Sequence, residues 1–579
     1  AIVAGVTGIA GLAGMANAVN VNPDGLGQVL LYPYYTVNGG NVTLISVVNT
    51  TERDKAVKVR FLEALNSAEV LDFNLYLSEF DVWTASIVRT DGGASLFTGD
   101  NSCTVPNNVG KGATGSPFLD FEFRSGGNNP DAVGTTGNVR LNASAAGTEV
   151  AISSAERMRQ GHIEMIEMGD LFDGTDGFIP ASWTTHISST RAPLNCGALE
   201  LAFTNPGGRW LTVSQGGPAN GGPGRALNAP SGGLFGGGAV VDVAFGRALT
   251  YNAEAIAGFY TSAGLTEPVS LGDPGTVDLH TFPGSVQPDL GRARTGVNAG
   301  VEFATARIFE PSGVVINANF VGTQGGVNAV SAAIMSRFVF NEFNLESAVA
   351  AATEWVVTFP TKRKHTYGRI GGDVRPFSDN VSSVGTNTPF DEHGLCEVYT
   401  FTVWDREESP GTSASTGPIV SPPPPPGQAA QPSSLCWESN VIAFNQTLGN
   451  NTPTTIFGAE PKQGAHGLTL PAARLQAGPT GWARIQFDDT RSTAAGFQNY
   501  LVSDDANPVG IIGLPVIGFW AADYTNAGVS AGVRANYGQI HKHRLGRDGY
   551  LLDATPRPAF GTPLPIGLRS WTLQGIGSN

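Results

Sequence analysis

The chain has few charged residues. Only 14% of its 579 residues are Asp, Glu, Lys or Arg, against roughly 25% in an average soluble domain. Acidic residues outnumber basic ones by 49 to 34, which gives a formal net charge of −15 at pH 7. A field of that sign repels phosphate backbones and anionic lipid. Nucleic acid is therefore not an expected partner, and most of the surface must consist of uncharged polar groups.

Cysteine is scarce as well, and none of the four cysteines forms a C-x-x-C pair. Zinc ribbons, thioredoxin-like redox sites and c-type haem attachment therefore lack their ligands. Four cysteines allow three disulfide pairings. Their order favours Cys103 with Cys196 and Cys396 with Cys436, because each loop then stays within one region. Such disulfides are typical of exported proteins.

Long apolar runs are missing after the first eighteen residues. Ala1 to Ala18 are nearly all Ala, Gly, Val and Ile, and they end in Ala16-Asn17-Ala18, an A-x-A cleavage pattern. We expect a signal peptide and an extracellular or cell-surface protein. A retained membrane anchor and an assembly strand kept in the mature protein are the alternatives, although four glycines make a membrane span marginal.

Catalytic motifs are incomplete. Gly528 to Gly532 matches G-x-S-x-G, yet no acid lies between Ser530 and the next histidine, and a hydrolase of that type needs an acid and then a histidine after its serine. Glu164 and Glu167 are expected on opposite faces of one strand, which does not suit the carboxylate pair of a glycosidase. We therefore expect no enzyme and name no catalytic residue.

Calcium is the metal that the sequence favours, and no other cofactor is expected. Asp170, Asp173 and Asp176 place three carboxylates within seven residues around glycine turns, and calcium takes six to eight oxygen ligands from flexible loops. The spacing is not that of an EF-hand, so a plain Asp/Gly turn is the alternative. His162-Ile163-Glu164 has only half of the zinc deaminase motif.

The remaining pattern predicts a mainly β protein. Gly and Pro number 76 and 37, which favours many turns between short strands. Asn38-Gly39-Gly40 predicts a tight hairpin between the strands on either side of it. Val57, Val59 and Phe61 alternate with Lys58, Arg60 and Leu62, which predicts a half-buried strand with its charges in water. We expect a multi-domain β-sandwich of immunoglobulin-like architecture with long loops.

One or two short helices are expected in the second half of the chain. Val330, Ile334 and Phe338 recur at spacings of four within Asn328 to Phe338, and Asn344 is a candidate N-cap for a helix that ends near Ala352. The predicted organisation has a signal peptide or retained segment at 1–18 and an N-terminal β-sandwich at 19–95. A loop-rich β region with the first disulfide follows at 96–300. The β-rich region at 301–579 contains the helices, the second disulfide and a Pro-rich excursion at 418–432.

Four segments of the chain are distinctive: Asn22-Pro23-Asp24-Gly25-Leu26-Gly27-Gln28-Val29-Leu30-Leu31-Tyr32-Pro33-Tyr34-Tyr35-Thr36, Gly161 to Gly169, Trp355-Val356-Val357-Thr358-Phe359-Pro360-Thr361-Lys362-Arg363, and Trp404-Asp405-Arg406-Glu407-Glu408. Together they resemble a family of uncharacterised exported proteins of Gram-negative bacteria, and the likeness reaches to about Glu408. The resemblance implies bacterial export. It carries over neither an activity nor functional residues, because no function is established for that family.

The function that the sequence favours is structural. We expect a subunit of a surface layer, sheath or filament that forms a homo-oligomer or polymer through β-strand edges. A segment such as Val19 to Leu31 is a candidate for completing a neighbour's sheet.

Two other functions stay open. One is a monomeric surface adhesin that binds glycans such as envelope polysaccharide through exposed aromatic residues, for which the candidates are Tyr32, Tyr34, Tyr35, Trp404 and Trp437. The basic run Lys362 to His365 is a candidate for docking on that polysaccharide or on an acidic neighbour, and a solvated strand end is the alternative. The other is a secreted hydrolase of unrecognised type.

Overall fold

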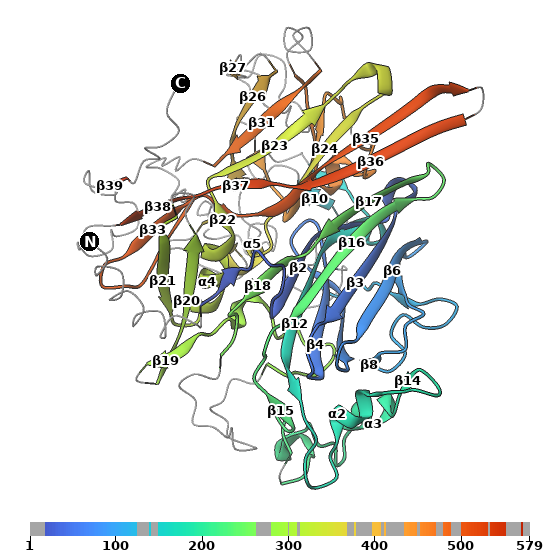
Figure 1. Ribbon diagram of the computed structural model, residues 1–579, viewed down its shortest axis with the longest axis vertical. Coiled ribbons are helices and arrows are strands. Elements are labelled where there is room, and N and C mark those ends of the chain that lie inside the picture. Colours follow the sequence, from blue (N-terminus) through green and yellow to red (C-terminus); the bar gives the residue numbers. More distant parts are fainter. Residues whose placement is uncertain are drawn as a thin grey trace, which may run out of the picture.

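The computed structural model describes residues 18–123, 138–140, 149–219, 221–261, 279–298, 300–309, 313–366, 376–377, 397–406, 410–412, 434–448, 452–470, 479–487, 499–530, 533–551 and 569–570. This part of the chain is mainly β, as the sequence predicts, with several antiparallel sheets that pack as β-sandwiches (Figure 1). The predicted signal peptide before Ala18 and the Pro-rich excursion lie outside the described residues. None of the helices in these ranges is long and apolar enough to cross a membrane.

The sheet that we call the central sheet organises the first half of the chain. Its strands run in the order β1 (Asn20–Val21), β18 (Glu254–Ala257), β2 (Val29–Thr36), β12 (Gln160–Leu171), β4 (Lys55–Glu63), β5 (Glu69–Leu77) and β8 (Cys103–Val105), and β15 (Leu227–Asn228) also pairs with β12. All of these pairings are antiparallel. Every residue of β2, β4 and β12 is buried. The sheet therefore has protein on both of its faces.

A second sheet closes one face of the central sheet. Its strands run in the order β17 (Arg247–Asn252), β16 (Leu234–Asp242), β3 (Val42–Asn49), β6 (Val82–Thr90), β7 (Gly93–Phe97) and β9 (Ser116–Pro117). Val57 and Phe61 of β4 share one apolar core with Val47 of β3 and Trp83 of β6. This sandwich takes strands from Asn20 through Ala257, so it extends past the expected boundary at residue 95.

The Asn38–Gly40 turn joins the two sheets rather than the two strands of a hairpin. Gly39 and Gly40 have φ angles of 61° and 85°, the left-handed values that the sequence predicts there. However, β2 lies in the central sheet and β3 in the second sheet, so the hairpin prediction is wrong. The turn carries the chain across the sandwich, and both strands contribute side chains to the core between the two sheets, Tyr32 from β2 and Val47 from β3.

The other face of the central sheet is covered by helices and a small sheet. Ala56, Ile166 and Ile256 share a second core with α4 and β20. The elements on this side and around its rim are α2 (Pro180–Thr184), β13 (His186–Ile187), β14 (Ala192–Pro193), α3 (Cys196–Leu201), β19 (Gly296–Asn298), β20 (Val301–Phe309), β21 (Val315–Val321) and α4 (Gly325–Ile334). α1 (Ser154–Arg157) packs instead against β7 of the second sheet. β19, β20 and β21 form one antiparallel sheet.

The second half of the chain forms another sandwich. Its inner sheet has the order β30 (Ala465–Leu468), β29 (Ser439–Phe444), β24 (Ala352–Thr358), β35 (Ile517–Ser530) and β36 (Val533–Lys542), and its outer sheet β27 (Pro410–Thr412), β26 (Thr400–Asp405), β31 (Thr480–Gln486), β23 (Phe338–Asn344) and β37 (Arg544–Gly546). Trp355 and Trp520 of the inner sheet pack against Phe401 and Ile485 of the outer sheet. Val356 and Phe519 point the other way, into the first sandwich.

Smaller pairings complete the described fold. They are β10 (Asn138–Arg140) with β11 (Glu149–Ala151), β22 (Met335–Ser336) with β34 (Leu514–Pro515), β25 (Glu397–Val398) with β28 (Ser434–Leu435), and the sheet of β32 (Tyr500–Val502), β33 (Val509–Ile512), β38 (Asp548–Leu551) and β39 (Arg569–Ser570). The last α-helix of the described part is α5 (Lys362–Thr366).

The helices differ in part from the prediction. α4 ends at Ile334, and Phe338 already begins β23. The expected helix from Asn344 to Ala352 is wrong, because β23 includes Asn344, β24 begins at Ala352 and only a 3-10 turn at Ser347–Val349 lies between them. These few residues must cross from the outer sheet to the inner sheet, roughly 10 Å away, which leaves no room for a longer helix. The described residues contain five short α-helices, and two of them, α4 and α5, lie in the second half of the chain.

The charges of β4 are not in water, contrary to the prediction from its alternating pattern. The Lys58 side chain is fully buried against Asp72. The Arg60 guanidinium reaches Glu164 at 2.6 Å and Glu69 at 2.7 Å. These side chains lie on the face of the central sheet that the second core covers. Charged and apolar residues of β4 do alternate between its two sides, but on the charged side the partners are carboxylates of the protein instead of water.

The disulfide between Cys103 and Cys196 is confirmed, and it ties β8 to the start of α3 across a sequence separation of 93 residues. Cys436 is also disulfide-bonded, whereas Cys396, its predicted partner, lies outside the described residues.

The ion pairs at the other end of β4 yield a prediction for stability. The Lys55 ammonium donates to Glu167 at 2.7 Å and to Asp170 at 2.9 Å with its side chain fully buried, whereas Arg53 contacts Asp170 with a side chain that is 60% exposed. We expect Lys55→Met to lower the free energy of unfolding by about 3–5 kcal/mol, since it leaves buried carboxylates without their cation. The matched control Arg53→Met should cost about 1 kcal/mol or less. Urea titration of both variants measures the difference, and equal losses would contradict it.

Candidate functional site

The three aspartates proposed for calcium each bond to different residues of the protein. Asp170 pairs with Lys55 and Arg53. Asp173 accepts hydrogen bonds from the backbone N–H and the hydroxyl of Ser182. Asp176 pairs with arginines that follow it in the chain, Arg209 and Arg225. The structure does not bring the three carboxylates together, and no group of three potential metal ligands occurs in the described ranges.

The basic run Lys362 to His365 is internal. Lys362 donates to the carbonyl of Cys436 at 2.7 Å, Arg363 to the carbonyl of Asn66 at 3.1 Å, and Lys364 pairs with Asp289. His365 contacts the hydroxyl of Ser331 at 2.8 Å. Lys362 and His365 are almost completely buried, so the expectation of a solvated strand end is wrong. The four consecutive residues Lys362 to His365 thus bond to four different parts of the chain.

Glu164 and Glu167 lie on opposite faces of β12, as the sequence predicts. Glu164 is paired with Arg60 on the face of the second core, and burial raises the pKa of Glu164 although Arg60 opposes the shift. Glu167 accepts from Lys55 and from the backbone N–H groups of Ser231 and Gly232 on the other face. Burial raises the pKa of Glu167 to about 8, against the effect of Lys55. Both carboxylates are therefore buried and bonded to groups of the protein itself.

His162, next to these glutamates, is a buried histidine with both ring nitrogens unbonded within the described part of the chain. Burial, together with the positive charge of Arg60, lowers the pKa of His162 to about 3. It is therefore a neutral core residue at physiological pH.

Two contacts between serine and histidine resemble parts of a catalytic triad. Ser331 and His365 are both completely buried, so no substrate can reach them. In the second contact, the Ser78 hydroxyl lies 3.1 Å from His186 Nδ1, and Asp81 approaches the same nitrogen at 4.0 Å. A triad needs the acid and the serine on different ring nitrogens.

The Ser530 motif lies at the far end of a hairpin, where Ser530 pairs with Val533. A nucleophile elbow needs a strand-to-helix turn instead.

Most of the aromatic candidates for glycan binding are core residues. Tyr32, Tyr34 and Tyr35 are fully buried in the first sandwich, and Trp437 is 9% exposed. Trp404 is different: it is half-buried on the outward face of the outer sheet. Its ring is stacked on that of Trp482, with ring centroids 3.9 Å apart and planes 5° apart. Trp482 is 39% exposed.

The aromatic pair has neighbours on adjacent strands. The Arg484 guanidinium lies 5.3 Å from the Trp404 ring centroid and 5.2 Å from that of Phe338. Phe340 contacts Trp482 with ring centroids 6.2 Å apart. We call these five residues the aromatic face. Their inward neighbours, such as Ala483 and Ile485, belong to the core of the second sandwich. Trp482 was not among the residues expected from the sequence. Every second residue of a strand lies on the same face, and this period along β31 could have identified Trp482 as a surface aromatic residue like Trp404.

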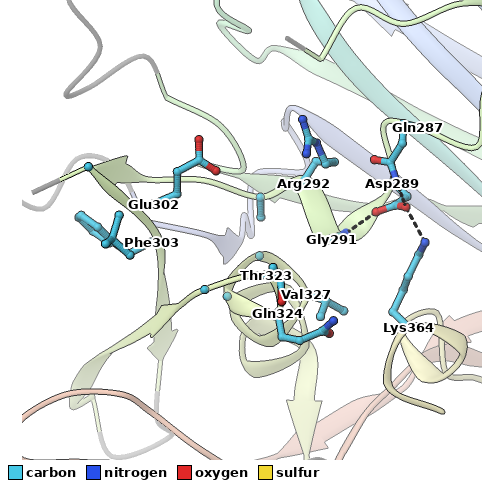
Figure 2. Close-up of a pocket in the computed structure, with 16 residues that line it drawn as sticks. Gln287, Asp289, Gly291, Arg292, Glu302, Phe303, Thr323, Gln324, Val327 and Lys364 are labelled. Carbon is cyan, nitrogen blue, oxygen red and sulfur yellow. Dashed lines mark hydrogen bonds and ion pairs between the residues drawn. The ribbon is translucent and has the colours of Figure 1, made fainter. Parts of the chain in front are cut away.

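A cavity of about 610 Å³ lies between α4, α5, β20 and the segment 287–293. Figure 2 shows Gln324 at the start of α4 and Lys364 of α5, both opposite the segment that carries Gln287 and Asp289. A Cβ atom at Gly326 would lie 2.1 Å from the carbonyl oxygen of Gly291. Only glycine therefore lets the start of α4 approach this segment so closely.

Asp289 is the centre of the cavity's hydrogen bonding. Its carboxylate accepts from Lys364, from the Gln287 side chain at 2.7 Å and from the backbone N–H of Gly291 at 2.8 Å. Burial favours protonation, yet Lys364 and Arg60 hold the pKa of Asp289 below its ordinary value. Sequence reasoning missed this site because its members lie up to 77 residues apart, from 287 to 364, without a local motif.

No family model, no curated protein and no solved structure matches this chain.

The buried state of His162 yields a prediction for pH dependence. A histidine with its pKa lowered to about 3 binds a proton in the unfolded chain, but not in the folded one, between about pH 6.5 and pH 3. Stability is therefore lost as the pH falls through 6.5. We expect His162→Leu to reduce the stability lost between pH 7 and pH 5 by about 2 kcal/mol. Urea titrations at both pH values measure it.

The control is Leu62→Ala, which changes the buried cross-strand neighbour of His162. It should destabilise the protein equally at both pH values. A His162→Leu variant with the pH dependence of the wild type would contradict the assignment.

Proposed function

We propose that the protein is an exported structural subunit that assembles with copies of itself through the edge strand β36. The observation that carries the proposal is the position of β36, a strand of 10 residues at the end of the inner sheet. It pairs with β35 on one side. On its other side, the described part of the chain supplies no strand. An open strand edge is a template for pairing with another chain.

The shape of the β35–β36 hairpin supports this use. β24 pairs with β35 as far as Asp523, and beyond that point β35 and β36 pair only with each other. Figure 1 shows this hairpin extending past the rest of the inner sheet. Two-stranded ribbons are marginally stable by themselves. One face is supported by β17, since Gly538 lies against Leu249 and Lys542 pairs with Glu254, whereas Tyr537 is 63% exposed.

The N-terminal segment is not the donor in this proposal. Val19 hydrogen-bonds with Thr305 and Arg307 of β20, and Asn20–Val21 pairs with β18 of the same chain. Val19 to Leu31 is thus part of its own fold here. Two β36 strands related by twofold symmetry would instead pair antiparallel around their middle, so that each Tyr537 lies beside its symmetry mate.

We expect Tyr537→Lys to weaken association at least about tenfold, because two lysines would then face each other across the new strand pair. Analytical ultracentrifugation of the purified chain at micromolar concentrations, with negative-stain microscopy of native cell-surface material, measures the assembly. The matched control is Phe80→Lys, since Phe80 is 61% exposed and lies outside the inner sheet; it should assemble like the wild type. A wild-type protein that stays monomeric in both measurements would refute the proposal.

Saccharide binding at the aromatic face is the second candidate function. The C–H faces of sugar rings pack on aromatic side chains, and the stacked Trp404–Trp482 pair is half-exposed beside the Arg484 guanidinium. This observation favours an adhesin over a hydrolase, because the five residues of the aromatic face include no carboxylate.

We expect Trp482→Ala to weaken binding of a polysaccharide by about tenfold, which corresponds to about 1.4 kcal/mol. Affinity electrophoresis in gels containing dextran, laminarin or alginate measures it. Phe309→Ala is the control, because Phe309 is 46% exposed on β20, away from the aromatic face. Equal retardation of wild type and Trp482→Ala in every gel would exclude this face as the binding site.

A further inference from the structure

Two residues that line the cavity beside Asp289 have side-chain oxygens that the protein leaves without a hydrogen bond. The side-chain oxygens Oε1 of Gln287 and Gln324 are buried and have no hydrogen-bond partner among the residues that the structure describes. Gln324 is the N-cap residue of α4, yet its side chain makes no capping bond. A buried acceptor without a donor costs about 1–3 kcal/mol. Two such acceptors in one cavity point to a ligand that brings donors.

Lys364 adds donors to the same cavity. An ammonium group has three N–H donors, and Asp289 is the one side chain in the described ranges with which Lys364 pairs. The Lys364 side chain is 34% exposed. The cavity thus contains two uncommitted acceptors and an ammonium with uncommitted donors.

Both carboxylates that line the cavity are paired with cations. Asp289 pairs with Lys364, and Glu302 pairs with Arg294 at 2.7 Å. The Arg292 side chain, which also lines the cavity, points away from Gln324 in Figure 2. An anionic ligand between Gln324 and Asp289 would approach a carboxylate without a free cation opposite. The ligand that fits is polar and uncharged.

We propose that this cavity binds a neutral pyranose unit, with vicinal hydroxyl groups between Gln287, Gln324 and Lys364. Each sugar hydroxyl donates one hydrogen bond and accepts others, which matches a wall of acceptors beside an ammonium. Val327, next to Gln324 in Figure 2, supplies apolar lining for the C–H groups of the ring. The cavity volume of about 610 Å³ lies in the range of small-molecule sites. The inference goes beyond self-assembly and does not depend on it.

The test is saturation-transfer NMR and calorimetry of the full chain with the methyl glycosides of glucose, galactose and mannose at millimolar concentrations. We expect at least one of them to bind saturably to the wild type. Gln324→Ala should weaken that binding about tenfold, which corresponds to about 1.4 kcal/mol, and Gln287→Ala should weaken it as well. Gln324 makes no bond that the fold needs, so its variant should keep the wild-type melting temperature.

Gln215→Ala is the matched control, because this glutamine is exposed in the 3-10 turn Val213–Gln215 and does not line the cavity, and it should bind like the wild type. Trp482→Ala separates the cavity from the aromatic face, since it should leave binding of the monosaccharide glycosides unchanged. The proposal is overturned if no glycoside binds, if Gln324→Ala binds as tightly as the wild type, or if inorganic phosphate binds there and the glycosides do not.

Discussion

The buried ion pairs of β4 are the interaction on which the rest of the structure depends. A strand with Lys58 and Arg60 on one side can be covered on that side only if carboxylates accompany the cations into the interior. β5 supplies Asp72 and Glu69, and β12 supplies Glu164. Because each of these cations is paired with a carboxylate of the same sheet, this face of the central sheet can be covered by a second layer of structure. That layer contains α4 and the three-stranded sheet.

The same ion pairs position the wall of the cavity. Lys58 donates to the carbonyl of Phe282 at 3.2 Å, and Asp72 accepts from the backbone N–H of Gly284 at 2.9 Å. These two bonds hold the chain that leads directly to Gln287 and Asp289. The opposite wall is held by α5, whose residues reach the N-terminal sandwich through Asn66 and the C-terminal part through Cys436. The cavity therefore lies where the cores of the molecule meet, and its shape is fixed by the packing of the central sheet.

The molecule covers its sheet faces more completely than its strand edges. The central sheet and the inner sheet both contribute residues to two cores. The inner sheet nevertheless ends on β36, and the outer sheet has the half-exposed aromatic face on its far side. The covered sheet faces that stabilise the fold thus lie apart from β36 and the aromatic face, the surfaces that we propose for interaction. The distinctive sequence segments in β2, β12 and β24 belong to the covered part: β2 pairs with β12, and the Thr358 hydroxyl of β24 donates to the carbonyl of Pro33 in β2 at 2.7 Å.

The sequence by itself determined the mainly β fold, the Cys103–Cys196 disulfide, the left-handed glycines at the Asn38–Gly40 turn and the opposite faces of Glu164 and Glu167. Each of these follows from local chemistry: turn residues, cysteine order and the period of two along a strand. Only the tertiary structure decided what covers each face. Lys58 and Arg60 alternate with apolar residues in the same way whether water or a carboxylate lies opposite them. Likewise, the basic sequence Lys362 to His365 does not show whether it lies on the surface or bonds to other parts of the chain. The candidate site depends on contacts between residues far apart in the chain, such as Asp289 with Lys364. A period gives the side of a strand or helix on which a residue lies, but the partner on that side is set by how the layers pack.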